Sequence, residues 1–165
     1  MEAVICRAPE FYGPEKTNSI TNSLIFEKIK QGKTPQVLLN EGVLRTLIWT
    51  PDASKATARI GNTPDAYGQT WHLPCDDNRL TYQQFIALIS TELGRPVQYK
   101  VLNKLTLKVG SIFSKRLREI QELLPRYEQD NIFDSSKFKQ RFPGFTVTTY
   151  KQGIEQILNE QKTRH

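Results

Sequence analysis

The chain has 165 residues, of which 38% are hydrophobic and 24% charged, and it carries a formal net charge of +6. This composition is typical of a soluble globular protein with a hydrophobic core, and it excludes a disordered chain. No apolar run approaches the roughly 20 residues of a membrane-spanning helix, and the first residues lack the pattern of a secretory signal. Two distant cysteines, Cys6 and Cys75, form no disulfide framework, so we expect reduced thiols in a cytoplasmic protein.

Hydrophobic periodicity predicts helices and strands that alternate along the chain. In chain order, the predicted elements are a strand at 3–6, a helix at 20–29, strands at 36–40 and 45–50, a helix at 51–60, a strand at 69–73, a helix at 82–93, a strand at 97–102, and helices at 105–124, 134–141 and 150–161. This order predicts an α/β layered fold without internal repeats, and we treat residues 1–165 as a single domain.

Capping residues mark several helix ends. Asn18 or Ser19 can cap the helix at 20–29. Pro51 stands in the first turn of its helix, where its missing N–H costs nothing. Thr81 caps the helix at 82–93, and Gly94 ends it.

The predicted strand at 3–6 is apolar throughout, which is typical of a buried strand with neighbours on both sides. Such neighbours are hard to find further along the chain, so we expect that Met1 is not the natural beginning of the protein. An unpaired strand edge invites pairing with another chain, and we therefore expect self-association through this edge.

Seven basic residues and no acidic residue lie between Arg95 and Arg118. They are Arg95, Lys100, Lys104, Lys108, Lys115, Arg116 and Arg118. Such a cluster can bind nucleic acid, an anionic membrane or an acidic substrate, or it can be a solvated helix face. No aromatic platform or known nucleic-acid motif accompanies it, which disfavours nucleic acid as a partner.

Motifs of common catalytic and metal sites are absent. His72 and His165 are the only histidines, no group of residues has metal-ligand spacing, and no phosphate-binding or dinucleotide-binding glycine loop is present. We expect His72 to be a structural residue of its strand. Tyr12 and Lys16 match a Y-x-x-x-K pair, but Gly13 and Pro14 between them oppose the helix that such a pair needs.

Several segments carry a resemblance to a known family. They are RAPEFYGP at 7–14, RTLIWTPDASKA at 45–56, AYGQTWHLP at 66–74, Leu80 with Thr81, and the region 134–158 with its DSSK and FPG runs. In this order they are similar to the motifs of extended short-chain dehydrogenases/reductases of the NAD-dependent epimerase/dehydratase type. The second segment keeps the family's arginine, aspartate and last alanine as Arg45, Asp52 and Ala56.

The resemblance implies a C-terminal, substrate-binding portion of a Rossmann-type enzyme with a late strand of its parallel sheet. The family's glycine-rich loop and its catalytic tyrosine and lysine come before this region, so NAD or NADP belongs to the intact parent and none is expected on this chain alone. The loop after the first strand runs beside the nicotinamide in the family. Ala8, Pro9 and Glu10 are therefore the predicted cofactor-binding residues, and no catalytic residue is expected here.

The resemblance also implies residues that bind a small-molecule substrate. Arg45 stands where sugar-nucleotide enzymes keep a diphosphate-binding arginine, and Arg126 matches the arginine of their R-P-G-H-D motif. Two guanidinium groups could clamp one anion, although Glu10 replaces the family's substrate-binding asparagine. Alternatively, both arginines are surface or structural residues. The parent would then act on a small neutral or hydrophobic carbonyl compound, with Phe11, Tyr12 and Trp49 as pocket walls.

Three hypotheses for function follow. The chain is the substrate-binding part of an NAD(P)-dependent oxidoreductase, epimerase or dehydratase and is inactive by itself. Alternatively, it belongs to a non-catalytic Rossmann-like binding or sensor protein of the same fold family. A basic nucleic-acid binder is the third possibility and would show salt-dependent binding.

Overall fold

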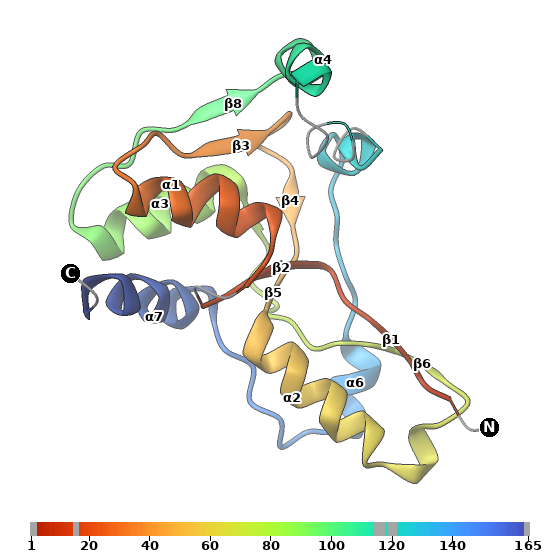
Figure 1. The fold of residues 1–165 in the computed structure, drawn as a ribbon. Coiled ribbons are helices and arrows are strands. Elements are labelled where there is room, and N and C mark those ends of the chain that lie inside the picture. Colours follow the sequence, from red (N-terminus) through yellow and green to blue (C-terminus); the bar gives the residue numbers. More distant parts are fainter. Residues whose placement is uncertain (1–2, 15–16, 114–117, 119–121, 164–165) are drawn as a thin grey trace. The chain divides into compact units, whose positions relative to one another are not determined.

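Figure 1 shows a computed structural model of the chain, which describes residues 3–14, 17–113, 118 and 122–163. The chain divides into two compact units. Unit 1 comprises Met1–Asn22, Thr46–Asn78 and Phe133–His165, and unit 2 comprises Ser23–Arg45 and Arg79–Ile132. Each unit is described by itself.

Unit 1 contains two parallel strand pairs. Strand β1 (Ile5–Arg7) pairs with β6 (Thr70–His72), and β2 (Glu10–Tyr12) pairs with β5 (Leu47–Trp49). Parallel pairing requires long crossover connections, as in α/β folds. The predicted α/β class, with parallel strands and helices, is therefore confirmed.

Four helical segments lie among the described residues of unit 1. They are α2 (Thr50–Gly61), the 3₁₀ turn η2 (Pro64–Ala66), α6 (Ser136–Arg141) and α7 (Tyr150–Thr163). The predicted helices at 51–60, 134–141 and 150–161 are confirmed with small shifts at their ends. Figure 1 shows α2 and α6 beside the β1–β6 pair.

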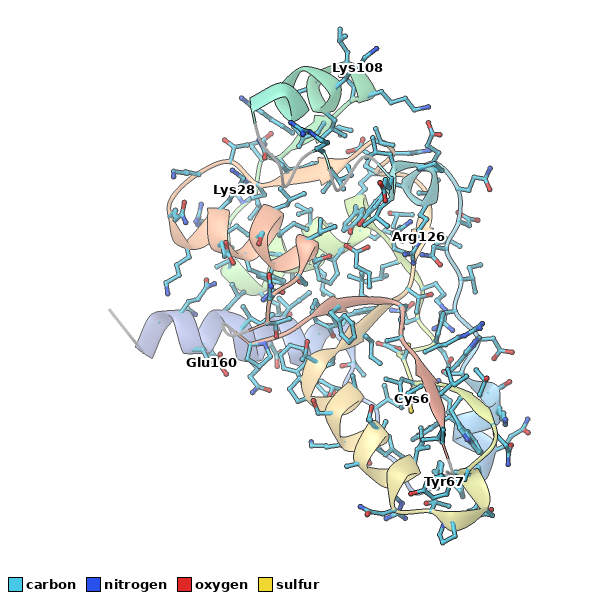
Figure 2. The ribbon with its side chains drawn as sticks, turned by 45° about the vertical axis from the view of Figure 1, so that its right-hand side comes forward. Cys6, Lys28, Tyr67, Lys108, Arg126 and Glu160 are labelled. Atoms are coloured by element: carbon cyan, nitrogen blue, oxygen red, sulfur yellow. The ribbon has the colours of Figure 1, made fainter. Side chains whose placement is uncertain are left out.

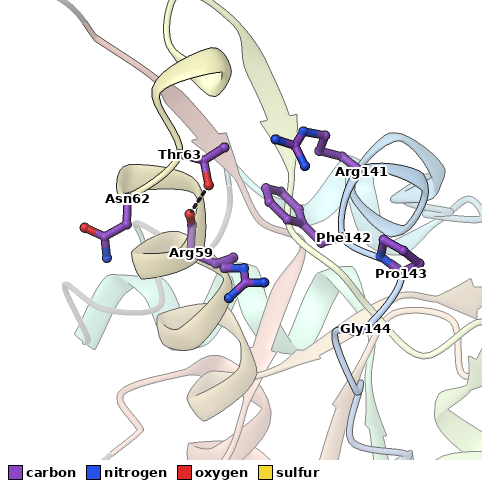
Figure 3. Close-up of a pocket in the computed structure, with 7 residues that line it drawn as sticks. All are labelled: Arg59, Asn62, Thr63, Arg141, Phe142, Pro143 and Gly144. Atoms are coloured by element: carbon purple, nitrogen blue, oxygen red, sulfur yellow. Dashed lines mark hydrogen bonds between the residues drawn. The ribbon is translucent and has the colours of Figure 1, made fainter.

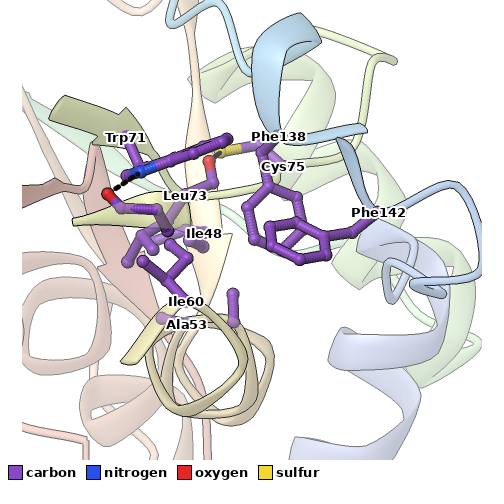
Figure 4. Close-up of a cluster of buried hydrophobic side chains, with 10 residues drawn as sticks. Ile48, Ala53, Ile60, Trp71, Leu73, Cys75, Phe138 and Phe142 are labelled. Atoms are coloured by element: carbon purple, nitrogen blue, oxygen red, sulfur yellow. Dashed lines mark hydrogen bonds between the residues drawn. The ribbon is translucent and has the colours of Figure 1, made fainter. Parts of the chain in front are cut away.

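The core of unit 1 lies between α2, β6 and α6 (Figure 4). Ala53, Ala56 and Ile60 recur at spacings of three and four, which places them on one face of α2. They belong to one cluster of buried side chains with Ile48, Ala66, Trp71, Leu73, Cys75, Phe138 and Phe142. The small side chains of the two alanines leave space on this face for the large aromatic rings of the cluster. The Trp71 indole N–H donates to the main-chain oxygen of Ala66 at 3.0 Å.

Strand β1 differs from its prediction. Val4, Cys6 and Ala8 pack against the core cluster, but Ile5 is 56% exposed and Arg7 is exposed as well. The prediction that this strand is buried therefore holds for one face only, and β6 supplies one neighbour further along the chain. The alternation of β-strand side chains puts Ile5 on the face opposite the core.

Unit 2 also contains two strand pairs. Strand β3 (Gln36–Leu38) runs parallel to β8 (Lys100–Leu102), and β4 (Leu44–Arg45) is antiparallel to β7 (Leu80–Thr81). Among its described residues, the helical segments include the π-helical turn η1 (Asn22–Phe26), α1 (Glu27–Lys30), α3 (Tyr82–Leu93), α4 (Lys104–Phe113) and the 3₁₀ turn η3 (Leu124–Tyr127). Phe26 meets Phe85 of α3 edge-on, with ring centroids 6.0 Å apart.

Helix α3 follows its sequence signals closely. Thr81 accepts a hydrogen bond from the Gln84 N–H, and the Gln84 side chain accepts one from the Thr81 N–H, which completes a capping box. Gly94 ends the helix with φ +65°, a left-handed conformation that suits glycine. The predicted cap and stop of this helix are confirmed.

Two predicted elements need correction. The strand expected at 45–50 is two strands, β4 and β5, which pair with different partners in different units. The helix expected at 105–124 is described as α4 only to Phe113, and residues 114–117 and 119–121 lie outside the described residues. Its predicted last residue, Leu124, instead begins the 3₁₀ turn η3.

Among the described residues, no helix combines the length and the apolar character that crossing a membrane requires.

Candidate functional site

The predicted cofactor-binding residues are Ala8 and Pro9 in the loop between β1 and β2, and Glu10 at the start of β2. Ala8 packs against the core cluster and Pro9 is buried. Glu10 is half-buried, and its carboxylate accepts a hydrogen bond from the Thr21 hydroxyl at 2.7 Å. The loop is therefore anchored from both sides within unit 1. Contact of these residues with a cofactor stays a prediction.

The three predicted aromatic pocket residues differ in their exposure. Phe11 is 37% exposed, whereas Tyr12 and Trp49 are 1% and 4% exposed. The rings of Tyr12 and Trp49 lie 5.2 Å apart, and Tyr12 lies 5.7 Å from Tyr150 of α7. Of the three, only Phe11 thus presents its ring to the surroundings, while Tyr12 and Trp49 pack against α7.

Helix α7 approaches these rings at Gly153. A Cβ atom at this position would lie 2.7 Å from the Tyr12 hydroxyl and 3.0 Å from the Trp49 ring. Burial raises the pKa of the Tyr12 phenol well above its usual value, and the nearby Tyr150 adds to this effect. Tyr12 therefore stays protonated, and it lies in a strand rather than a helix. The exclusion of the Tyr12–Lys16 pair as a catalytic pair is supported, and Lys16 lies outside the described residues.

Polar side chains lie so close to the Gly13 backbone that only glycine fits at this position. Its N–H donates to the Asn22 side-chain oxygen at 3.2 Å, and the Asn22 amide donates back to the Gly13 carbonyl at 2.8 Å. A Cβ atom at Gly13 would lie 2.6 Å from the Thr17 hydroxyl and 2.8 Å from the Thr50 hydroxyl. The glycine of the Y-G-P motif thus has a structural explanation. Sequence analysis missed Asn22, and its only signal was a polar residue inside an apolar helical pattern.

Asp52 of the second family-like segment is also structural. It is 2% exposed, and its carboxylate accepts a hydrogen bond from the main-chain N–H of Thr148 at 2.6 Å. Asp52 therefore ties the first turn of α2 to the segment that precedes α7.

In unit 2, Arg45 is buried against η3. Its side chain is 2% exposed and lies over the Tyr127 ring, with the guanidinium carbon 4.3 Å from the ring centroid. One guanidinium nitrogen donates to the main-chain oxygen of Arg126. Asp130 adds a second link, since its carboxylate accepts from the Leu44 N–H at 2.8 Å. Arg45 therefore holds the backbone that carries Arg126.

The Arg126 side chain, in contrast, is exposed at η3 (Figure 2). The Arg45 guanidinium group lies at the Arg126 backbone. This proximity permits a shared anion but does not test it, so the clamp stays a prediction. Glu128, which would repel an anion, forms an ion pair with Lys104 at 2.5 Å.

The described residues of the basic cluster are Arg95, Lys100, Lys104, Lys108 and Arg118, and all five are exposed. Lys115 and Arg116 lie outside the described residues. Since Lys104 pairs with an acidic side chain of the same unit, part of this charge is already balanced within unit 2.

The histidine and the cysteines have structural surroundings. His72 stacks on Phe133, with centroids 4.2 Å apart, and its Nδ1 donates to the Asp134 carbonyl at 2.7 Å in the tautomer that carries this proton. Cys6 and Cys75 are free thiols, and burial raises the pKa of the Cys6 thiol, which makes it less reactive. Within the described part of the chain, no group of three His, Cys, Asp or Glu side chains could hold a metal ion.

The described strands and helices have the Rossmann-like α/β fold of solved NAD-dependent epimerases and dehydratases. Three solved structures illustrate the likeness. UDP-glucuronic acid 4-epimerase from Bacillus cereus, in complex with UDP-glucuronic acid and NAD, matches 98% of this chain with 14% identity and a TM-score of 0.71. UDP-glucose 4-epimerase from Thermotoga maritima, with UDP-glucose, matches 100% with 13% identity and a TM-score of 0.71. dTDP-glucose 4,6-dehydratase from Bacillus anthracis, in complex with NAD, matches 97% with 15% identity and a TM-score of 0.68.

The chain spans less than half the length of these enzymes, namely 46%, 48% and 44% of the three in the same order. At this level of identity, the likeness is one of fold. No protein-family model matches the sequence, and no curated protein matches it either.

Proposed function

We propose that this chain is the substrate-binding part of an NAD(P)-dependent oxidoreductase, epimerase or dehydratase. The observation that carries the proposal is the match of almost the whole chain to about half of each of several such enzymes. The order of the family-like segments in the sequence agrees with this match. The substrate would be a nucleotide sugar, because two of the three solved enzymes hold one.

Among the predicted substrate-binding residues, Arg126 of unit 2 and Phe11 of unit 1 have exposed side chains, and each is considered by itself as a candidate ligand contact. Arg126 offers an exposed guanidinium group that can bind phosphate oxygens through paired hydrogen bonds. Phe11 offers an exposed ring, which can pack against a sugar or a base. Arg45 acts as a positioning residue, since it holds the Arg126 backbone and the Tyr127 ring.

The residues of this chain do not fit a complete dinucleotide site. The dinucleotide fingerprint needs glycines two and three residues apart, whereas the nearest two glycines here, Gly61 and Gly68, are seven apart. Ala8, Pro9 and Glu10 would line one side of the nicotinamide in the intact protein. We therefore expect that the isolated chain neither binds NAD(P) tightly nor turns over a substrate, and no chemical step is assigned to its residues.

Calorimetry of the isolated 165-residue chain tests this proposal. We expect no micromolar binding of NAD or NADP, but measurable binding of UDP-glucose or dTDP-glucose that Arg126→Gln weakens by about tenfold, the loss of one charged hydrogen bond pair. Arg95→Gln, which removes an equally exposed arginine outside the site, is the matched control. Micromolar binding of NAD(P) contradicts the proposal. So does a lack of nucleotide-sugar binding, or an affinity that Arg126→Gln leaves unchanged.

A non-catalytic binding or sensor protein of the same fold is the alternative. The sequence of the polypeptide that supplies the cofactor-binding half distinguishes the enzyme from the sensor protein. A glycine-rich fingerprint together with a helical Y-x-x-x-K pair supports the enzyme, and a fingerprint without that pair supports the sensor.

We further propose that the isolated chain self-associates through β1. Ile5 is 56% exposed on this short strand, and an exposed apolar side chain on a strand favours pairing with another chain. Sedimentation velocity tests this expectation, and Ile5→Lys should shift the chain towards the monomer. A clean wild-type monomer at high concentration contradicts it.

A further inference from the structure

A surface pocket of unit 1 lies beside the core cluster and contains none of the predicted site residues (Figure 3). It has a volume of about 550 Å³ and lies between the end of α2 and the turn that follows α6. Its lining residues are Arg59, Asn62, Thr63, Arg141, Phe142, Pro143 and Gly144. Two of the seven are arginines and none is acidic, so the lining is cationic.

The Phe142 ring organises both arginines. Its side chain is 6% exposed, and the guanidinium carbons of Arg59 and Arg141 lie 5.9 Å and 5.1 Å from the ring centroid. Guanidinium groups are attracted to the faces of aromatic rings at such distances. One buried ring therefore brings two cations from separate helices, α2 and α6, to the same pocket.

Arg141 is further oriented by Asp65. Its Nε donates to one carboxylate oxygen at 3.1 Å, and one of its terminal nitrogens donates to the other oxygen at 2.9 Å. These two bonds use two of the five N–H groups of an arginine, so further N–H groups can serve a ligand in a fixed orientation. Asp65 is not a lining residue. It balances one positive charge and leaves the charge of Arg59 for the ligand.

The end of α2 shapes the other wall. The Thr63 hydroxyl donates to the main-chain oxygen of Arg59 at 2.7 Å, and the Asn62 N–H donates to the Ala58 carbonyl at 3.1 Å. Thr63 thus fixes the last turn of the helix, whereas the Asn62 side chain adds an amide group to the lining.

We propose that this pocket binds the oxyanion group of a small ligand, a phosphate or a carboxylate. Two guanidinium groups line the pocket, and a planar guanidinium group can donate two parallel hydrogen bonds to such an anion. The site is independent of the proposed substrate-binding role, since none of its residues belongs to the Phe11 loop or to the Arg45–Arg126 cluster.

A nitrogen-detected titration of arginine side-chain resonances tests the site with inorganic phosphate and with citrate at constant ionic strength. We expect saturable shifts of Arg59 and Arg141, and an affinity that Arg59→Gln and Arg141→Gln each reduce by about tenfold. Arg95→Gln, which removes the same charge from an exposed position in unit 2, should leave the affinity within about twofold. Tighter binding of phosphate indicates a phosphate ester as the ligand, and tighter binding of citrate indicates a carboxylate.

Arg141→Lys separates geometry from charge. The lysine keeps the positive charge but lacks the planar fork, so binding should weaken although the charge is unchanged. Circular dichroism of each variant should show an intact fold, because Arg59 and Arg141 are both exposed. Absence of saturable shifts in the wild-type chain, or equal affinities for the wild-type chain and both glutamine variants, overturns the proposal.

Discussion

The segment around Gly13 in unit 1 and the cluster around Arg45 in unit 2 both resemble ligand-binding motifs, but the structure uses their residues differently. In unit 1, Tyr12 is buried, and Gly13 and Asn22 exchange two hydrogen bonds. In unit 2, one arginine is buried and the other is exposed, since Arg45 holds the backbone of Arg126.

This difference teaches that a family-like motif mixes two kinds of residue. Some of its members, such as Gly13 in unit 1 and Arg45 in unit 2, hold together the packing of their own unit and would be needed even without a ligand. Others, such as Phe11 and Arg126, are exposed and gain nothing from internal packing, so they are the better candidates for ligand contact. Burial distinguishes the two kinds, and sequence position does not.

The largest effect should appear when the two arginines of unit 2 are changed separately. Arg45→Met should lower the free energy of unfolding by about 3 kcal/mol, because it removes a buried cation with its hydrogen bond and its ring contact. Arg126→Met should change it by less than about 0.5 kcal/mol, because that side chain is exposed. Urea denaturation of both variants gives the comparison, and equal losses would contradict the division of roles.

A second effect tests the packing of unit 1 around Tyr12. Gly153→Ala should destabilise the chain by about 2 kcal/mol, because its Cβ would overlap buried Tyr12 and Trp49. Gly61→Ala is the matched control, since a Cβ there meets no atom within 4 Å. It should be neutral or stabilising by up to about 1 kcal/mol through helix propensity. If thermal unfolding shows the same shift for both variants, the contact with α7 does not hold Tyr12.

A smaller effect is expected at the start of α3 in unit 2. Thr81→Ala removes the hydroxyl acceptor of the capping box and should cost about 1 kcal/mol. Thr91→Ala, in the same helix but away from its start, should be neutral or slightly stabilising because alanine is the better helix former. Urea denaturation measures both, and an equal loss at the two positions would argue against the cap.

The smallest effect concerns the exposed pair of Asp65 and Arg141 in unit 1. The Arg141 hydrogen bonds lower the pKa of the Asp65 carboxyl below its ordinary value of 3.8. The pair therefore stabilises the folded chain above that ordinary pKa, and this contribution is lost as the pH falls through the lowered pKa. A carboxyl carbon titration should show the Asp65 midpoint moving up towards 3.8 in Arg141→Gln. An unchanged midpoint would mean that the pair does not form in solution.

Local signals in the sequence determined the elements whose hydrogen bonds are local. Helix α3 begins and ends where Thr81 and Gly94 predict, because a side-chain cap and a left-handed glycine act within one helical turn. The apolar spacing of Ala53, Ala56 and Ile60 likewise determined which face of α2 is buried. The segments that resemble the dehydrogenase family were sufficient to predict the fold class.

Only the tertiary structure decided which side chains are exposed and which distant residues meet. The apolar run at 45–50 gave no sign that its two halves pair with different strands in different units, because strand pairing depends on contacts far along the chain. Arg45 and Arg126 look alike in sequence, and their different burial follows from the Tyr127 ring and the Asp130 carboxylate that close over β4. Arg59 and Arg141 are far apart in sequence and carry no motif. Both pack near the buried ring of Phe142, and packing of this kind has no local signature in the chain.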